Sequence, residues 1–452
     1  MSRAREIIRD APTEMCRPWP RHVLTAAQWS ELAREPLSLL AAWADTTRVH
    51  ALYEDAASEN RLPVSVELDA GFYPALSPHH PAARLYERTI RDLWGHMAAG
   101  GDDGSWLDHG HWPHTRPLAL RPGPKAPTAD PPEFQPVLGE TAMQWPIGPI
   151  GPGIGEARHL RLTLEGSRIA RAECRLGYAH KGSLMLMRSK SPRVAARFAA
   201  RLAGDATVAH AIAFAKATEA ALSVEAPPRA IGLRGLMLRL ERIATNLDDL
   251  GVVAGIVGSA EAQARCGVRQ EYLRRGLAAA FGHRLMMDGV VPGGVSADAD
   301  ANGLSALRQI LGALHAEVPA IRTLFATGPL GALLTGLGAT PTGDAAKRCQ
   351  NRLRAIERDA EAAIDRLADL PEGPLTVALP LESGEGLGKA ASARGDIWHW
   401  LRLDHGQIAA VFPRDPGWTL WPLAEATLVG AEARDAALIC ASFGLPVSGM
   451  DL

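Results

Sequence analysis

Side chains that could move a proton or orient a ligand gather between two glycines at residues 175–182, at the end of an expected strand. Tyr178, His180 and Lys181 lie in this segment, and their titration or hydrogen bonding suits both roles. From spacing alone, a turn held by structural hydrogen bonds is the favoured interpretation. Chemistry at this segment therefore depends on what the rest of the chain places beside it.

Three other turn-rich segments are weaker candidates for a functional site than residues 175–182. Residues 109–114 carry three histidines, but no carboxylate or cysteine joins them at a metal-site spacing, so a hydrogen-bonded loop is favoured. Residues 282–294 hold four glycines, which predict a tight packing corner. Residues 148–155 look like a phosphate-binding loop, but their prolines remove backbone donors and a hairpin follows, which argues against nucleotide binding.

The five cysteines exclude several classes of site, because no two of them lie closer than 83 residues. They are Cys16, Cys174, Cys266, Cys349 and Cys440. This spacing gives no zinc or iron–sulfur motif and no disulfide framework, and it is typical of a reducing cytosol. The formal net charge of -2 gives no long-range attraction to nucleic acid or to anionic lipid.

Two segments bear on membrane insertion. The N-terminal sixteen residues lack the apolar core of a signal peptide. The uncharged run 323–343 contains five glycines and two prolines, so we expect a loop with a short helix rather than a membrane span. Any membrane contact is expected to pass through partners.

Six prolines within residues 122–136 predict an extended connector that divides the 452 residues into two parts. The first part is expected to be α+β, with helical spacing over 24–45, a strand over 64–68, a helix over 82–94 and a loop over 104–118.

The second part is expected to begin with a hairpin and to continue as a helical bundle. Alternation predicts strands at 159–164 and 168–175. Apolar residues at helical spacing predict four long helices, at 193–222, 229–257, 261–281 and 344–368. The remaining chain is expected to be β-rich over 375–381 and 397–412 and to form a short helix at 423–438.

In their order along the chain, these segments resemble the large subunit of membrane-bound, energy-converting nickel–iron hydrogenases. That group includes hydrogenase-4 component G and the formate hydrogenlyase large subunit, and it is homologous to the D component of respiratory complex I. The similar blocks are residues 146–149, 175–182, 240–244, 282–294 and 394–396. Residues 72–78, 81–88 and 92–95 resemble the C component of complex I.

The resemblance implies an α+β fold in three parts. Residues 1–121 would form an α+β domain like the C component of complex I, and residues 122–140 a proline-rich linker. Residues 141–452 would form a mainly helical bundle with peripheral β-strands, similar to the hydrogenase large subunit and to the D component of complex I.

The chain departs from this family at the metal. The resemblance places the four nickel–iron cysteine ligands at Ala203, Ala206, Pro446 and Gly449, none of which can coordinate a soft metal. It therefore implies no metal site and no cofactor bound by this chain. Of the first cysteine motif, only the histidine is retained, as His210.

The resemblance also places eight polar residues in the former active-site cleft or its proton route. The proton-route candidates are Glu173, His180, Lys181, Asp205 and His210, and the ligand-binding candidates are Tyr178, His283 and Asp288. Structural support of the fold is the alternative role for all eight. The family's quinone-binding histidine corresponds to Gly151, and residues 201–210 contain no tyrosine, so quinone remains a candidate ligand without its usual residues.

By resemblance, the chain is a non-nickel large subunit of a membrane-associated oxidoreductase, active only within its complex. The complex would couple electron transfer of the NADH:quinone or formate hydrogenlyase kind to ion translocation. The expected partners are a small iron–sulfur subunit, which would hold the clusters, and antiporter-like membrane subunits, at the cytoplasmic face of the inner membrane. The alternative is a degenerate paralogue that acts as a hydrogenase assembly scaffold, and an active hydrogenase would need an unprecedented ligand set.

Overall fold

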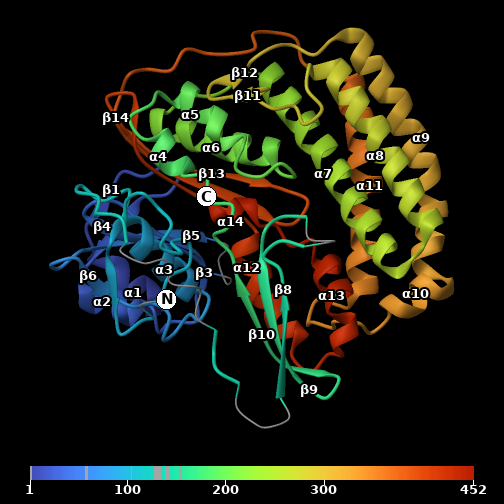
Figure 1. The fold of residues 1–452 in the computed structure, drawn as a ribbon. Coiled ribbons are helices and arrows are strands. Elements are labelled where there is room, and N and C mark those ends of the chain that lie inside the picture. Colours follow the sequence, from blue (N-terminus) through green and yellow to red (C-terminus); the bar gives the residue numbers. More distant parts are fainter. Residues whose placement is uncertain (1–2, 56–59, 103, 127–133, 138–141, 152–154) are drawn as a thin grey trace.

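The computed structural model describes residues 3–55, 60–102, 104–126, 134–137, 142–151 and 155–452 (Figure 1). The expected linker 122–140 and the glycine-rich segment 148–155 lie partly outside the described residues.

The first part of the chain forms a five-stranded sheet in the order β1-β2-β5-β4-β3. In that order the strands are Thr13–Glu14, Arg21–Leu24, Asn60–Glu67, Arg48–Asp55 and Ser38–Ala44. Around the sheet lie α1 (Arg3–Arg9), α2 (Ala26–Leu32), β6 (Phe72–Pro74), α3 (Ala83–Trp94) and β7 (Met97–Ala99). The sequence-based strand at 64–68 and helix at 82–94 are confirmed, as β5 and α3.

The helical spacing over 24–45 was a wrong prediction for most of that range. The structure forms only the short α2 there, which a Thr25–Gln28 capping box begins. The chain then passes Pro36 and continues as β3, whose last four residues are buried. A run of apolar residues buried on both faces of a sheet gives no clean alternation, so its spacing resembles that of a helix.

The second part begins with the expected hairpin, in a three-stranded sheet of order β10-β9-β8. Its strands are β8 (Ala142–Ile147), β9 (His159–Glu165) and β10 (Arg168–Arg175), followed by the short helix α4 (Ser183–Met187). The two strands predicted from alternation are confirmed as β9 and β10.

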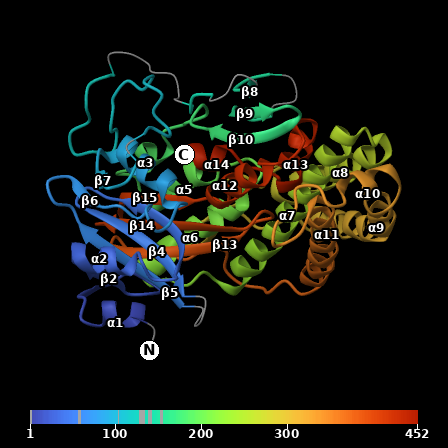
Figure 2. The same ribbon diagram turned by 90° about the horizontal axis from the view of Figure 1, so that it is seen from below.

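The long helices lie side by side at one end of the molecule (Figures 1 and 2). They are α7 (Pro228–Val257), α8 (Ala260–Phe281), α9 (Ala301–Ala326) and α11 (Ala345–Ala368), with α10 (Gly328–Leu334) after α9. Three of the four predicted helices are confirmed as α7, α8 and α11. The helix α9 was missed, although Leu307, Leu311, Leu314 and Val318 follow helical spacing and are buried.

The helix predicted over 193–222 is two helices, α5 (Pro192–Ala199) and α6 (Thr207–Leu222). The chain between them leaves the helical path, and α6 begins where a carboxylate from α7, Glu241, accepts its free backbone N–H groups. A long-range cap of this kind has no local sequence signal.

The last sheet is formed by β13 (Gly384–Ala391), β14 (Asp396–Asp404) and β15 (Gln407–Arg414), and it packs on α6. Glycines 384, 386 and 388 face α6, where an added Cβ would lie 2.2, 2.1 and 2.1 Å from backbone oxygens of α6. The sheet and helix can therefore approach only because β13 has no side chain there.

The β-rich range 397–412 is confirmed as β14 and β15, joined by a turn, and two other predictions in this last part were wrong in detail. The range 375–381 is not a strand, and the third strand of the sheet is the glycine-rich β13. The helix predicted at 423–438 is divided into α12 (Gly417–Leu428) and α13 (Ala436–Phe443), with Gly430 in a left-handed conformation between them. Two short strands, β11 (Val290–Val291) and β12 (Gly294–Val295), and the C-terminal α14 (Ser448–Asp451) complete the fold.

One hydrophobic core runs from the N-terminal sheet into β14 and β15. Trp43 of β3 lies 5.6 Å from Trp400 and 6.2 Å from Phe412 between ring centroids. Figure 2 shows the two sheets beside each other, with the long helices beyond them. The domain limits at 121 and 140 stay a prediction.

No helix among the described residues combines the length and apolar character that a membrane span requires.

Candidate functional site

A small recess lies where the start of α6, the β13–β14 turn, the end of β15 and the C-terminal segment meet. Its lining includes Asp205, Ala206, Arg394, Asp415 and Pro446. Its volume is about 10 Å³, roughly the space that one water molecule needs. Residues far apart in the sequence therefore enclose one polar, water-sized space.

The structure brings positions of the missing cysteines to this recess. Ala206 and Pro446 line it, and Ala203 is buried one turn before Ala206. Gly449 lies against the carboxyl group of Asp415, and a Cβ at position 449 would be 2.4 Å from Asp415 Oδ2. Asp415 therefore takes up the space that a side chain at position 449 would need.

The residues present do not fit a thiolate-held nickel–iron centre. The four positions offer methyl, proline and glycine groups, and none of the five cysteines lines the recess. The carboxylates of Asp205 and Asp415 do line it, but they are hard oxygen ligands, whereas such a centre takes soft thiolates. In the described part of the chain, no group of three or more His, Cys, Asp or Glu side chains is arranged as a metal site.

Arg394 closes one side of the recess with two acids. Its Nη2 lies 2.7 Å from Asp249 Oδ1, its Nη1 contacts Asp205, and Arg352 Nε donates to Asp249 Oδ2 at 3.2 Å. Burial opposes ionisation of Asp249, yet the two guanidinium groups hold its pKa below the ordinary value. Burial raises the pKa of Asp205, an effect that Arg394 offsets only in part.

Asp415 begins a buried row of three hydrogen-bonded groups. Its Oδ2 lies 3.2 Å from His210 Nε2, and His210 Nδ1 lies 3.0 Å from His399 Nε2. The two histidines are completely buried, and Asp415 nearly so. When His210 Nε2–H donates to the Asp415 carboxyl group, His210 Nδ1 is an acceptor, and His399 Nε2–H must donate to it.

The far end of this row is unpaired. Burial, and then the neighbouring His210, lowers the pKa of His399 well below its ordinary value, so the ring is neutral. Its Nδ1 is a buried lone pair without a hydrogen-bond partner among the described residues. The row therefore joins one unpaired acceptor, His399 Nδ1, to a carboxylate that lines the recess through two hydrogen bonds.

A protonated acid supports the segment before α6. Glu241 of α7 accepts hydrogen bonds from Val208 N at 2.5 Å and Ala209 N at 2.9 Å. Complete burial raises the pKa of Glu241 to about 8, and Asp205 contributes to the shift. Thr245 Oγ1, from the same helix, donates to Asp205 O at 2.8 Å. Helix α7 thus fixes the segment that supplies Asp205 and Ala206.

The segment 177–181 lies outside the lining of the recess, and it is hydrogen-bonded to Asp451 of α14. The Asp451 carboxylate accepts hydrogen bonds from Gly177 N and Ala179 N at 2.8 Å, and His180 Nδ1 lies 2.6 Å from Asp451 O. Lys181 Nζ donates to Leu202 O at 2.8 Å. Burial lowers the pKa of both His180 and Lys181. These two candidates therefore support the recess without lining it.

Four other candidates lie apart from the recess lining. Tyr178 packs edge-on against His109 at 4.8 Å between centroids. Glu173 accepts from Gln135 N at 3.0 Å on the hairpin. His283 is exposed in a turn, and Asp288 forms a bidentate pair with Arg201 at 2.6 and 2.8 Å. Of the eight candidates, the structure brings Asp205 and His210 together through Asp415 and Arg394.

Sequence reasoning missed the groups that complete the site. Arg394 lies in one of the blocks that carry the resemblance, but no role was assigned to it. Asp249, His399 and Asp415 come from a helix, a buried strand and a strand end, and nothing in their spacing links them. Glu241 could have been suspected as a carboxylate on the apolar face of a predicted helix, because such a group needs buried partners.

Comparisons with known proteins support the resemblance. No family model matches the sequence. The chain is 31% identical over 204 residues to hydrogenase-4 component G of Escherichia coli, which covers 43% of this chain and 36% of that protein. It is 25% identical over 362 residues to membrane-bound hydrogenase subunit alpha of Pyrococcus furiosus, covering 66% of this chain and 84% of that protein. The match thus spans about a third of the first relative.

A solved structure confirms the mixed α+β fold. The chain superimposes on a chain of the membrane-bound sulfane sulfur reductase, an archaeal respiratory membrane complex, with a TM-score of 0.65. The two are 19% identical, and the match covers 70% of this chain and 100% of that chain. The chain is thus a homologue of the large subunits of membrane-bound hydrogenases and of the D component of NADH-quinone oxidoreductase.

Proposed function

We propose that this chain is the large subunit of a membrane-associated oxidoreductase complex in which the former nickel pocket handles protons without a metal. One observation carries the proposal. Asp415 lies in the space that a side chain at position 449 would need, and it is hydrogen-bonded to His210. A proton donor and acceptor has thus taken the place of a thiolate.

The proton movement that this geometry allows has three steps. A proton arriving at His399 Nδ1 releases the proton on His399 Nε2 to His210 Nδ1. His210 then releases its Nε2 proton to Asp415, whose carboxyl group lines the recess. When a group in the recess removes that proton, the net charge of the row is restored, and both rings are left in the opposite tautomer, which must be reset before a second proton can follow. Donor–acceptor separations of 3.0 and 3.2 Å suit such transfers.

The electron path lies outside this chain in the proposal. Because the five cysteines are scattered, the iron–sulfur clusters would belong to a small partner subunit. Antiporter-like membrane subunits would bind beneath, at the cytoplasmic face of the inner membrane, and would couple electron transfer to ion movement. A quinone headgroup would have to widen the recess, which now holds about one water molecule.

The test is metal analysis and activity of the complex purified through a tag on this chain. We expect iron from the partner, no stoichiometric nickel, and a fall of about 10²-fold in turnover for Asp415→Asn, the size of a typical proton-transfer contribution. A quinone analogue tests the acceptor in the same preparation. Nickel stoichiometric with this chain, or full turnover by Asp415→Asn, contradicts the proposal.

A second function is favoured by the small volume of the recess. A water-sized recess with paired charges also suits an assembly or maturation scaffold that holds a small subunit without redox work. Affinity purification separates the two functions. Stable recovery of membrane subunits supports the oxidoreductase, and association only with immature hydrogenase supports the scaffold.

A further inference from the structure

The segment between Glu173 and Asp205 is strongly basic, although the chain as a whole has a formal net charge of -2. Residues 174–204 contain seven lysines and arginines and no aspartate or glutamate. The seven are Arg175, Lys181, Arg188, Lys190, Arg193, Arg197 and Arg201. The segment carries α4 and α5 and then continues into the lining of the recess at Asp205. The small net charge of the whole chain therefore conceals a local concentration of positive charge.

Helix α5 presents part of this charge to solvent. Arg193 and Arg197 lie about one turn apart and are exposed, with Val194 beside them. The opposite side of the helix is small and apolar, and it is buried in the protein. Lys190, just before the helix, and Arg201, just after it, are also exposed. These five residues make up the basic face of the molecule.

Most of the charge on the basic face is not balanced by acids. No carboxylate of the described residues lies within 4.0 Å of Lys190, Arg193 or Arg197. Arg201 is paired, through hydrogen bonds of 2.6 and 2.8 Å to Asp288. Arg201, and more weakly Arg197, lower the pKa of Asp288, so this acid offsets one of the four charges. Cations one helical turn apart repel each other, and solvation alone does not turn this repulsion into a gain.

Exposed apolar side chains accompany these cations. Val194 is 45% exposed, and Met185 and Leu186 of α4, which packs on α5, are 53% and 45% exposed (Figure 1). Arginine and methionine are enriched at protein–protein interfaces, where charged groups surround an apolar centre. A helix at a membrane surface needs instead a free apolar side to insert, and that side of α5 is buried in the protein. The composition therefore favours a protein partner over an anionic membrane.

We infer that the basic face and the exposed part of α4 bind an acidic surface of another protein subunit. Carboxylates of that subunit pair with Lys190 and with Arg193 and Arg197, whose guanidinium groups match a carboxylate through two parallel hydrogen bonds. Its apolar centre covers Met185 and Val194. Opposite charges on the two surfaces orient the encounter and exclude partners with a basic surface. The inference rests on the proposed function in one respect, because the partner is taken from the same complex.

The first test is cross-linking of the complex purified through a tag on this chain. A water-soluble carbodiimide joins a lysine amine to a carboxylate without a spacer, so it detects only acids in direct contact. We expect Lys190 to be linked to an aspartate or glutamate of another subunit, and the link to be lost at high salt, which screens exposed charges. A complex in which Lys190 is linked only within this chain, or to no acid, overturns the inference.

A triple variant tests the charge itself. Lys190→Glu, Arg193→Glu and Arg197→Glu together should reduce recovery of the cross-linked subunit at least tenfold. The control changes the net charge equally, by the same substitution at three arginines elsewhere whose side chains are 67–83% exposed, and it should leave recovery unchanged. The three control positions are Arg168, Arg358 and Arg434. Wild-type recovery by the folded triple variant overturns the inference.

Vesicles distinguish a membrane from a protein partner. The purified full-length chain is mixed with vesicles of phosphatidylcholine alone and of phosphatidylcholine with phosphatidylglycerol. We expect no binding to either. Binding to the anionic vesicles that the triple variant loses would assign the basic face to lipid and would overturn the inference. Stoichiometric nickel in the complex would contradict the proposed function and leave the Lys190 cross-link intact, so the two failures are distinguishable.

Discussion

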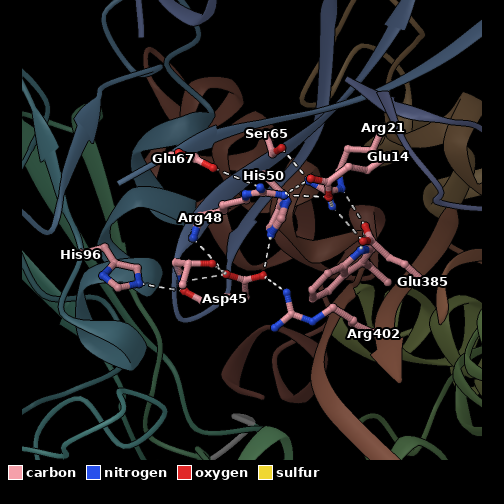
Figure 3. Close-up of polar contacts among 12 residues, drawn as sticks. Glu14, Arg21, Asp45, Arg48, His50, Ser65, Glu67, His96, Glu385 and Arg402 are labelled. Atoms are coloured by element: carbon pink, nitrogen blue, oxygen red, sulfur yellow. Dashed lines mark hydrogen bonds and ion pairs between the residues drawn. The ribbon is translucent and has the colours of Figure 1, made fainter. Parts of the chain in front are cut away.

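Two buried clusters of charge, built from the same residue types, treat protons in opposite ways. One is the seam between the N-terminal sheet and the last sheet, where Arg21 bonds Glu385 at 2.9 and 3.0 Å and Arg402 bonds Asp45 (Figure 3). Although burial favours the neutral acid, His50 and Arg402 hold the pKa of Asp45 well below its usual range. The seam therefore keeps its carboxylate ionised.

Around the recess, burial prevails at three acids, although the guanidinium groups of two arginines hold the pKa of a fourth, Asp249, below its ordinary value. Burial raises the pKa of Glu241 to about 8 and that of Asp451 to about 6, and it raises the pKa of Asp205. Glu241 and Asp451 are stabilised chiefly by backbone N–H groups rather than by an arginine. Acids near the recess can therefore hold a proton close to neutral pH.

The difference separates a mechanical role from a chemical one. At the seam, rings of Trp43 and Trp400 pack on His50 at 5.6 and 5.0 Å, and every acid drawn there faces an arginine (Figure 3). The recess has a water-sized space and a histidine with an unpaired nitrogen. Fixed charges in a packed layer join two halves of a fold, whereas exchangeable protons beside a space can be transferred.

The largest effect is expected at the seam, from Glu385→Ala. This change leaves Arg21, whose side chain is 3% exposed, without its buried partner and removes the acceptor of Trp400 Nε1. Breaking a buried pair in this way costs about 3–5 kcal/mol of unfolding free energy, measured by urea denaturation. The control is Glu14→Ala, which removes a 43% exposed partner of the same arginine and should cost under ~1 kcal/mol. If the two variants lost the same unfolding free energy, the buried pair would have no special part in joining the two sheets.

The recess should show its own dependence on pH. Because the pKa of Glu241 is raised in the folded state, that state keeps a proton that the unfolded chain releases. The contribution of Glu241 to the unfolding free energy, measured as the difference between wild type and Glu241→Gln, should then fall by about 1.4 kcal/mol per pH unit between about pH 5 and 8. Glu241→Gln should remove this slope, whereas Asp451→Asn should change the curve only below about pH 6. If the plots of unfolding free energy against pH were parallel for wild type and Glu241→Gln, the raised pKa of Glu241 would be contradicted.

A smaller effect is expected from Gly449→Ala. The new Cβ would lie 2.4 Å from Asp415 Oδ2, and such crowding costs about 1–3 kcal/mol. Gly204→Ala is the control, because an added Cβ there meets nothing within 4 Å. In combination with Asp415→Ala, Gly449→Ala should cost less than it does alone, since the space is then free. Additive costs would show that Asp415 does not occupy the space of a side chain at 449.

The same contrast explains what could be predicted from the sequence. Amphipathic helices such as α7 and α11 were found within a residue at each end, because their apolar spacing is local. The strand β13 was not found, because its glycines are explained only by the helix that packs on them. Local periodicity identifies a helix or a strand, but it does not show which other element packs against it.

The candidate site, too, could be predicted only where its residues lie in a local motif. The resemblance supplied Asp205 and His210, which lie in or beside one ordered motif segment. Asp415 and His399 could not be found in this way, because their roles come from contacts with His210 across about 190 to 205 residues of sequence. A buried polar residue acquires a function from its partners, and those partners are set by the tertiary fold.

The sharpest comparison pairs two buried histidines, with His399→Phe in the recess row and His50→Phe at the seam. Each change removes a buried polar contact, with His210 for His399→Phe and with Asp45 for His50→Phe, so each should lower the unfolding free energy by about 1–3 kcal/mol. Turnover of the purified complex should separate them, because only His399 is part of the row that ends at Asp415. We expect a loss of about 10²-fold for His399→Phe and none for His50→Phe. An equal loss in both would assign it to disturbed packing and would exclude the proton row.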